Sequence, residues 1–447
     1  MKRQTSRQVS LKTSRVLWQS VALIVKRGTT SILLCLAGAS SCFAAELPQA
    51  DNQKHLGVAS CASGVCHGSV RPRSGTRVLQ NEYVTWSQRD RHRVAYQTLL
   101  TAQSQQIAAN LGLANAHEAS LCLDCHADNV APEQQGERFL ISDGVGCEAC
   151  HGGSEHYISA HADSDNARKV SLDAGLYPSD NTQARAELCL SCHLGTPDKM
   201  ASHDIMGAGH PRLAFELDTF SILQPAHYAV DDDYRELKSH TDSMSTWVIG
   251  QTSSALQSLH LISARLDKGG QFPELALFDC HACHHSMNEA RWLADQDGQL
   301  PAGSVRLNVA NFVMLFAIAS IVSEPLEATL RKQVSELHQR VAAGGPLEKL
   351  IASISSSIHE IEASAVPQSN PKSARQLLAA LVAAGGQDRF RDYIAAEQVV
   401  MAIDLLLTTA GMRDAESDWL NRLYIQVSDE DTFIPAELTL TMLEYQR

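Results

Sequence analysis

Aromatic residues are scarce in this chain. Phe, Trp and Tyr together make up only 5% of its 447 residues, which is little apolar bulk for an ordinary protein core. No stretch alternates between apolar and polar residues for long enough to indicate a sheet. The apolar stretch from Phe312 to Val322 is too short to cross a bilayer. We therefore expect a mainly α fold with extensive loops and no transmembrane span in the mature chain.

Acidic residues are absent from positions 1–45, which carry seven Lys and Arg residues. A short apolar stretch from Ile32 to Ala39 follows the basic residues, and small residues lie around Ala44. This order is typical of a secretory signal peptide, so we expect residues 1–45 to be removed and the mature protein to be periplasmic. A lipid anchor at Cys42 is disfavoured because no leucine lies three positions before it.

Beyond residue 45, no cysteine lies outside a pair. The ten cysteines form five pairs, each followed at once by histidine: Cys61/Cys66/His67, Cys122/Cys125/His126, Cys147/Cys150/His151, Cys189/Cys192/His193 and Cys280/Cys283/His284. Two thiols at this spacing can bond to both vinyl groups of a haem, and the next residue supplies the proximal imidazole. Four residues separate Cys61 from Cys66, where the other pairs have two, but that longer loop can still span both vinyl groups. The pattern predicts five covalent haem c groups.

Other uses of paired cysteines fit this pattern less well. Zinc sites combine two cysteine pairs into one cage and do not need a histidine after each pair. Iron–sulfur sites of this kind use thiolates alone. Disulfides within Cys-x-x-Cys would close loops too small to stabilise a fold much.

The net charge of the mature chain limits the binding partners that can be expected. Seven of the 37 Lys and Arg residues lie in positions 1–45 and all 50 Asp and Glu residues lie beyond them, so the mature chain has a net charge of −20 instead of −13. This charge disfavours nucleic acid and favours a basic redox protein, soluble or membrane-associated.

The placement of the pairs divides the chain. We expect a signal peptide over 1–45, a pentahaem cytochrome c domain over 46–290, packed around its haems, and an α-helical domain over 291–447. The last of these contains no cysteine and only two histidines, His338 and His359, which are expected to be surface or satisfied residues. Breaker-free periodic stretches predict helices over 82–111, 242–266, 325–343, 347–363, 373–384 and 389–410. Residues 196–212 contain two prolines and two glycines and are expected to form an irregular loop.

Residues 58–193 resemble the multihaem cytochromes of the cytochrome c-554 family. The resemblance rests on the first haem motif, on Trp86 followed by His92, on the motif at Cys122, on Gly-Val-Gly-Cys147-Glu-Ala-Cys150-His151-Gly, on His161 ten residues later, and on the motif at Cys189. It implies that His92 and His161 are distal ligands of other haems. A fifth motif, the widened first motif and the long C-terminal region depart from the family pattern.

Five bis-histidine haems need five distal imidazoles. Besides His92 and His161, the candidates are His203, His210 and His227, which lie in or near the loop between the fourth and fifth motifs. Each of these three could equally be a solvated surface histidine. The weaker alternates are His156, His240, His260, His281 and His285, while His55 and His117 are expected to be surface residues.

Two functions remain open at this point. An electron-transfer cytochrome needs closely packed haems with six ligands each, and the surplus of histidines satisfies this need. The alternative is an oxidoreductase that acts on a small nitrogen or sulfur compound at one open haem. No Cys-x-x-Cys-Lys motif is present, so the lysine that marks the open haem of pentahaem nitrite reductases is missing.

The mature protein is expected to carry five covalent haems per chain. Intact mass and the pyridine haemochrome assay both count them. A mass corresponding to four haems would exclude the widened motif at Cys61 as an attachment site.

Overall fold

The computed structural model describes residues 46–163, 166–266, 274–284 and 305–445. The predicted signal peptide and the predicted domain boundary after residue 290 lie outside these ranges. Within them the chain forms helices and loops, and its only β pairing consists of two isolated bridges, His55 with Gln135 and Phe278 with Leu307. The expected fold class, mainly α with extensive loops, is confirmed.

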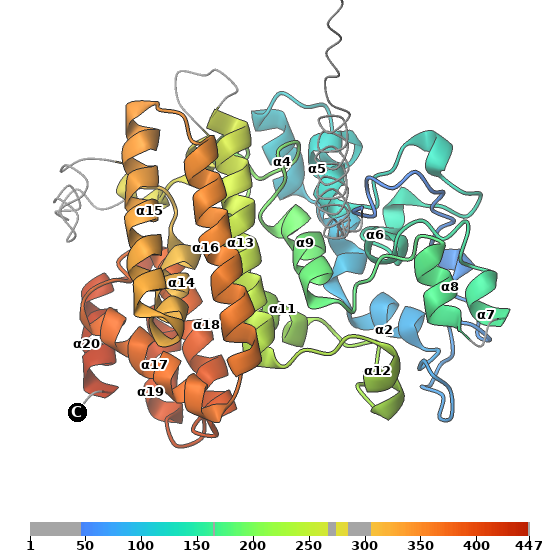
Figure 1. Ribbon diagram of the computed structural model, residues 1–447. Helices are drawn as coiled ribbons and strands as arrows, with labels where there is room; N and C mark the ends of the chain where they lie inside the picture. The colour runs from blue at the N-terminus through green and yellow to red at the C-terminus, as the bar shows by residue number, and fades with distance from the viewer. Residues whose placement is uncertain (1–45, 164–165, 267–273, 285–304, 446–447) are drawn as a thin grey trace, which may run out of the picture. The chain divides into compact units, whose positions relative to one another are not determined.

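The part of the chain before residue 240 consists of short helices joined by long loops (Figure 1). They are α2 (Glu82–Arg89), α3 (Ala95–Thr98), α4 (Ala102–Asn110), α5 (Ser120–His126), α6 (Glu148–His151), α7 (Ala160–Asp163), α8 (Ala167–Asp173), α9 (Thr182–His193), α10 (His203–Gly207), α11 (Leu217–Leu223) and α12 (Asp232–Leu237).

Two expectations for this part were wrong in detail. The helix expected over 82–111 is broken after α2, because Asp90 adopts an extended conformation and its carboxylate accepts a hydrogen bond from the backbone N–H of His92. The loop expected over 196–212 contains the short helix α10, whose first turn is capped by the Ser202 hydroxyl. In both segments, a hydrogen bond from a backbone N–H to a nearby side chain therefore determines where a helix ends or begins.

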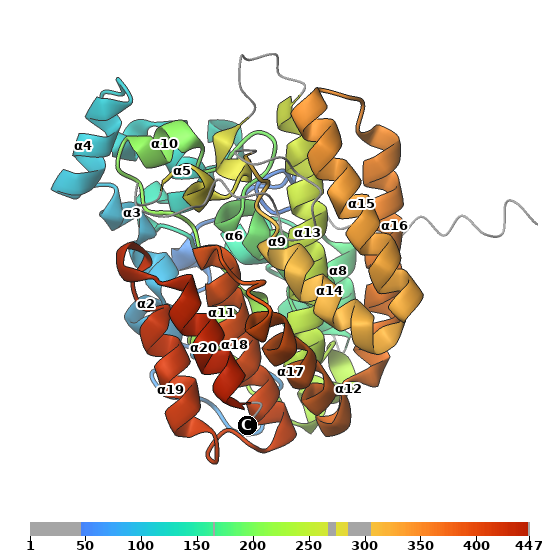
Figure 2. The ribbon, with the colours of Figure 1, turned by 90° about the vertical axis from the view of Figure 1, so that its left-hand side faces the viewer.

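The remainder forms long helices. They are α13 (Ser243–Leu266), α14 (Ala310–Val322), α15 (Glu324–Ala343), α16 (Glu348–Ala365), α17 (Pro371–Gly386), α18 (Tyr393–Ala410), α19 (Ser417–Gln426) and α20 (Pro435–Tyr445). Figures 1 and 2 show α13, α15 and α16 side by side, and α16 contacts both of the others. The expected helices match α13 and α15 to α18, whereas α19 and α20 were not anticipated.

Gly385 shows why one expected helix end was misplaced. The helix expected over 373–384 was predicted to end just before this glycine, yet α17 continues through Gly385 and Gly386. A Cβ atom on Gly385 would lie 2.7 Å from Cγ of Met442 in α20. The glycine thus allows two helices to pack closely. Gly344, in contrast, ends α15 as expected, with a positive φ of 69°.

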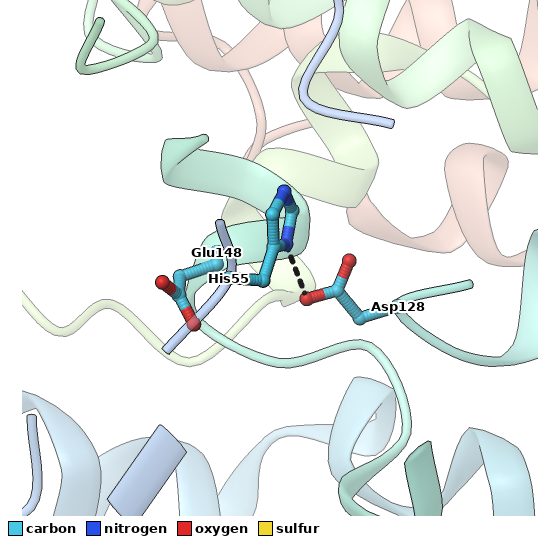
Figure 3. A group of neighbouring side chains, drawn as sticks. All are labelled: His55, Asp128 and Glu148. Carbon is cyan, nitrogen blue, oxygen red and sulfur yellow. Dashed lines mark hydrogen bonds and ion pairs between the residues drawn. The ribbon is translucent and has the colours of Figure 1, made fainter. Parts of the chain in front are cut away.

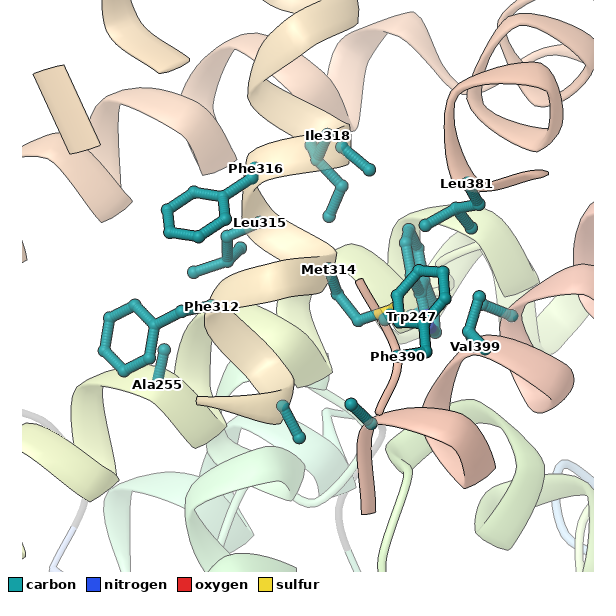
Figure 4. Close-up of a cluster of buried hydrophobic side chains, with 14 of the residues drawn as sticks. Trp247, Ala255, Phe312, Met314, Leu315, Phe316, Ile318, Leu381, Phe390 and Val399 are labelled. Atoms are coloured by element: carbon teal, nitrogen blue, oxygen red, sulfur yellow. The ribbon is translucent and has the colours of Figure 1, made fainter. Parts of the chain in front are cut away.

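The main apolar core lies among the long helices. Helix α14 is apolar on all sides and contacts α13, α15, α16, α17 and α18, so the apolar run at Phe312–Val322 is a central core helix. Trp247, Met314, Leu381 and Val399 meet here from four helices (Figure 4). Among the described helices, α18 is long and apolar enough to cross a membrane, but 67% of it is buried in this core.

The segments that carry the first four haem motifs have little apolar core of their own. Their one buried hydrophobic cluster among the described residues has five members, and other buried apolar residues, such as Tyr157, Tyr177 and Leu190, lie outside it. The five members are Leu99, Ala108, Ala116, Leu123 and Ala127. A haem group presents a large apolar surface, so this is the distribution expected if haems fill the interior of this part.

Arg212 joins the loop after α10 to the long helices. Its guanidinium contacts the carboxylates of Glu397 at 2.6 Å and Glu430 at 3.1 Å, and its charge lies 5.2 Å from the ring centre of Tyr393. Gln398 also donates to the backbone oxygen of Phe215 at 2.9 Å. The C-terminal helices therefore hold the chain segment that follows His203 and His210.

Replacing Leu381 with alanine should destabilise the core. Leu381 is fully buried, and removing such a side chain costs about 2–5 kcal/mol of unfolding free energy. Leu440→Ala in α20 is the matched control, because 62% of Leu440 is exposed, and it should change stability by no more than about 0.5 kcal/mol. Denaturant unfolding followed by far-UV circular dichroism measures both; equal effects would contradict the position of the core.

Candidate functional site

The five Cys/His motifs, numbered sites 1 to 5 in chain order, each lie on or beside a helical turn. Helix α5 contains all of site 2, α6 begins just after Cys147 of site 3, and α9 ends at His193 of site 4. Residues i, i+3 and i+4 share one face of a helix, so both cysteines and the histidine point the same way. Site 5 starts in a 3-10 turn, and site 1 follows one.

Each motif histidine faces a histidine from another segment. The distances between ring centres are 6.1 Å for His67 and His161, 6.3 Å for His126 and His210, 6.2 Å for His151 and His227, 6.3 Å for His193 and His92, and 6.3 Å for His284 and His203. The five partners are the five histidines chosen from the sequence as distal candidates.

This spacing suits an iron between the two rings. An imidazole nitrogen lies about 2.0 Å from a first-row metal and about 1.2 Å from its own ring centre, so two imidazoles on opposite sides of one iron have ring centres about 6.4 Å apart. Rings in direct van der Waals stacking would approach more closely, as His193 and Phe215 do at 4.8 Å. The residues present therefore fit a six-coordinate haem at each motif.

Hydrogen bonds orient five of these rings through Nδ1. His67 Nδ1 lies 2.9 Å from the Glu82 carboxylate, and His92 Nδ1 lies 2.9 Å from that of Asp90. Backbone oxygens accept from the other three, as the following distances show: His126 to Ala95 at 3.1 Å, His161 to Tyr157 at 3.0 Å and His210 to Pro211 at 2.7 Å. A proton held on Nδ1 leaves the Nε2 lone pair for a metal.

Burial keeps several of the rings neutral. It lowers the pKa of His151 to about 4, with a further contribution from His227, and it lowers the pKa of His193 to about 4 beside His92. The pKa values of His126 and His227 are also lowered by burial. A neutral imidazole is the form that binds a metal.

Neighbouring motifs touch through their cysteines. The Cys61 thiol of site 1 lies beside that of Cys147 in site 3. Cys125 of site 2 lies beside Cys192 of site 4, and the Cys192 thiol is 3.9 Å from the backbone oxygen of Asp124. Asp128, just after site 2, donates through its backbone N–H to the oxygen of Gly144, just before site 3, at 2.9 Å. None of the ten motif cysteines forms a disulfide, so sites 1 to 4 form one contiguous group with every thiol available for a thioether.

Comparison with known families agrees with this geometry. Residues 60–152 match the model of the family described as Cytochrome c554 and c-prime. Over these residues the chain belongs to the cytochrome c554 family. No curated protein and no solved structure matches the chain. The family match covers the motifs at Cys61, Cys122 and Cys147, and it identifies a c-type cytochrome.

The remaining histidines of this cytochrome have other surroundings. His156, His240, His260 and His359 are exposed, and His285 lies outside the described residues. His117 is partly exposed beside Tyr96, His281 is buried 3.5 Å from Glu430, and His338 donates to the backbone oxygen of Val334.

His55 was expected at the surface, and this expectation was wrong. Its side chain is fully buried, and its Nδ1 lies 2.8 Å from Oδ2 of Asp128 (Figure 3). Asp51 lies 3.7 Å from Nε2. Burial alone would lower the pKa of His55, but hydrogen bonding to these two carboxylates outweighs it and raises the pKa to about 10. A charged imidazole can be buried here because its partners are carboxylates.

Glu148 lies beside this pair, between the two cysteines of site 3. One of its oxygens accepts from the backbone N–H of Leu56 and Ser154 and from the Ser154 hydroxyl, and the other accepts from Gly57 N–H at 2.7 Å. Ligand atoms of His55, Asp128 and Glu148 lie within 4.8 Å of one another, but these hydrogen bonds already account for the positions of the three groups. Glu148 therefore fastens site 3 to the segment that leads into site 1.

Sequence reasoning assigned no role to Glu82, Asp90, Asp128 or Glu148. A local signal existed only for Asp90, because an aspartate two residues before a histidine commonly caps the following turn. Glu82 lies 15 residues from His67, and Asp128 lies 73 residues from His55. Such pairings depend on the tertiary fold.

Replacing His55 with glutamine should lower stability in a pH-dependent way. The raised pKa of His55 means that its contribution is fully present below about pH 6.5 and is lost as the pH rises through about 10. The denaturant midpoint of the wild-type holoprotein should fall over this interval. The midpoint of His55→Gln should start lower and change less, while His117→Gln should follow the wild type. Parallel profiles for His55→Gln and the wild type would contradict a charged His55.

Proposed function

We propose that this protein is an exported pentahaem c-type cytochrome that transfers electrons through bis-histidine haems. The observation that carries the proposal is the spacing of 6.1–6.3 Å between each motif histidine and its partner histidine. Five such pairs would give all five irons two axial imidazoles. An iron with both axial positions filled exchanges electrons without binding a substrate.

The haems supply the redox chemistry, and the chain holds and tunes them. The proposed proximal ligands are His67, His126, His151, His193 and His284, and the proposed distal ligands are His161, His210, His227, His92 and His203, in the same order. In this arrangement each haem links two segments of the chain that are far apart in sequence.

Carboxylates distinguish sites 1 and 4 from the others. Glu82 accepts from Nδ1 of His67, and Asp90 accepts from Nδ1 of His92. An anionic acceptor makes an imidazole a stronger donor to the metal, which favours ferric iron. Sites 1 and 4 are therefore expected to have lower reduction potentials than they would with neutral acceptors.

Contacts between motifs support electron exchange from site to site. Cys61 meets Cys147 and Cys125 meets Cys192, so site 1 adjoins site 3 and site 2 adjoins site 4. Helix α10 connects site 2 with site 5, because His203 begins this helix and His210 follows it. We propose that electrons pass between sites 1 and 3 and between sites 2 and 4, and that they reach site 5 from site 2.

The alternative function, an oxidoreductase for a small nitrogen or sulfur compound, needs an open iron beside acid or base groups. No motif histidine lacks an opposing histidine in the structure, so this geometry favours the electron carrier.

The proposed export and the proposed redox partner both rest on the sequence. The basic and apolar pattern of residues 1–45 supports a periplasmic location, as haem attachment to an exported chain requires. The net charge of −20 on the remaining chain supports a basic redox partner, and the chain is proposed to have no transmembrane span after export.

Replacing His161 with alanine should convert the iron of site 1 to the high-spin state. The variant should keep all five haems, because the thioether bonds do not depend on the distal ligand. Optical and electron paramagnetic resonance spectra should lose about one fifth of the low-spin signal. The potential of that haem should rise, because an imidazole that favours ferric iron has been removed.

His156→Ala is the matched control. His156 lies five residues before His161 and is exposed, so its removal should leave every iron low-spin. A fully low-spin spectrum of His161→Ala would exclude the proposed pairing at site 1.

A further inference from the structure

The loop before α2, residues 62–80, is locally basic in an acidic protein. It contains Arg71, Arg73 and Arg77, all exposed, and no acidic residue. The chain beyond residue 45 as a whole has a net charge of −20. The segment itself therefore carries a charge opposite to that of the whole molecule.

The loop is folded together with the widened motif of site 1. Nη2 of Arg73 donates to the backbone oxygen of Gly64 at 2.9 Å, and Arg73 N–H donates to that of Leu79 at 2.9 Å. Ser69 N–H donates to the Gln80 oxygen at 2.8 Å. A Cβ on Gly68 would lie 1.9 Å from the oxygen of Ala62, so only glycine fits after His67. The extra residues of the motif and the arginines thus form one structured surface.

Apolar side chains lie among these arginines. Val65 is 73% exposed and Val70 is 85% exposed. Cys66 is also exposed, whereas the cysteines of sites 2, 3 and 4 are all partly covered. Exposed apolar side chains that are surrounded by charges of one sign are typical of small, transient interfaces between proteins.

Cys283 of site 5 is the other exposed motif cysteine. Glu430 lies 3.5 Å from His281 of this site, but it is also paired with Arg212 at 3.1 Å, so the described residues around site 5 carry both signs of charge. Residues 62–80, in contrast, contain three arginines and no acidic residue.

We propose that residues 62–80 form a docking surface for an acidic redox protein that exchanges electrons with site 1. Arg71 and Arg77 attract its carboxylates, while Val65 and Val70 supply apolar contact. Arg73 holds the loop to Gly64. The electron exchange rests on the proposed function, but the anion-binding surface does not.

The kinetic experiment uses hexacyanoferrate(III), a trianion, as the probe. Each reduced haem iron gives one electron to one hexacyanoferrate(III), which becomes hexacyanoferrate(II). At about 0.1 M salt the screening length is about 10 Å, so charges near the point of contact decide the sign of the salt effect. The oxidation rate of the reduced holoprotein should fall as salt is raised from about 0.1 to 0.5 M. A net charge of −20 acting alone would make it rise.

The double variant Arg71→Gln/Arg77→Gln tests whether these two arginines attract the anion. It should oxidise at least about fivefold more slowly at 0.1 M salt, because local charges of this kind change association rates by about tenfold or more. The matched control, Lys349→Gln/Lys372→Gln, removes the same charge from exposed positions on α16 and α17 and should match the wild type. Arg73 is left in place because it holds the loop.

Binding without electron transfer separates this proposal from the proposed function. Hexacyanocobaltate(III) has the same charge and shape but is redox-inert, and it should slow amide hydrogen exchange in residues 62–80 of the wild type and not of the double arginine variant. This result is independent of the spin states of the irons. A rate that rises with salt, or an equal effect of both double variants, would overturn the docking surface.

The double arginine variant also tests whether a different partner binds residues 62–80. Dimers that dissociate in the double arginine variant would assign the surface to a second copy of this acidic chain. Arginine-dependent binding to phosphatidylserine vesicles would assign it to a membrane. Either outcome would overturn an acidic redox protein as the partner.

Discussion

Opposed imidazoles at a spacing of about 6.2 Å are the constraint on which the account of this structure depends. Two rings so placed leave room for an ion and make no contact with each other. The buried apolar cluster of the segments that carry the first four motifs is small, with five members. The pairs join segments as distant as His67 with His161 and His126 with His210. Axial ligation would therefore act as a set of cross-links that replaces much of a conventional core.

The long C-terminal helices give this arrangement a support. Their core is continuous from α13 to α20 and includes fully buried residues such as Trp247 and Leu381. Arg212, through Glu397 and Glu430, attaches to it the loop that follows His210. Gln398 holds Phe215, whose ring stacks on His193 at 4.8 Å. A structural role for the C-terminal region in positioning proposed ligands of sites 2 and 4 follows from these contacts.

The sequence predicted the elements that depend on local pattern. Cysteine spacing located the five motifs, and apolar periodicity located α13 and α15 to α18. The candidate distal histidines could also be chosen from sequence, because histidines such as His203 and His210 lie between motifs in a segment with few other uses for them. Ligation by these histidines remains a prediction.

Features set by the tertiary fold could not be predicted. Which histidine faces which motif depends on how the loops cross, and His55 was misplaced because Asp128, its partner, is 73 residues away. The helix expected over 373–384 was ended too early, because sequence alone did not reveal that Met442 packs against Gly385. Helix α10 arose in a segment rich in glycine and proline because Ser202 caps it locally.

The most direct test of the central claim is a count of spin states in the purified wild-type holoprotein. Electron paramagnetic resonance with magnetic circular dichroism, normalised to haem content, measures how many irons carry two axial histidines. The account predicts that all five irons per chain are low-spin and bis-histidine. A high-spin iron in stoichiometric amount would contradict it, and would show that at least one of the five histidine pairs does not hold a metal.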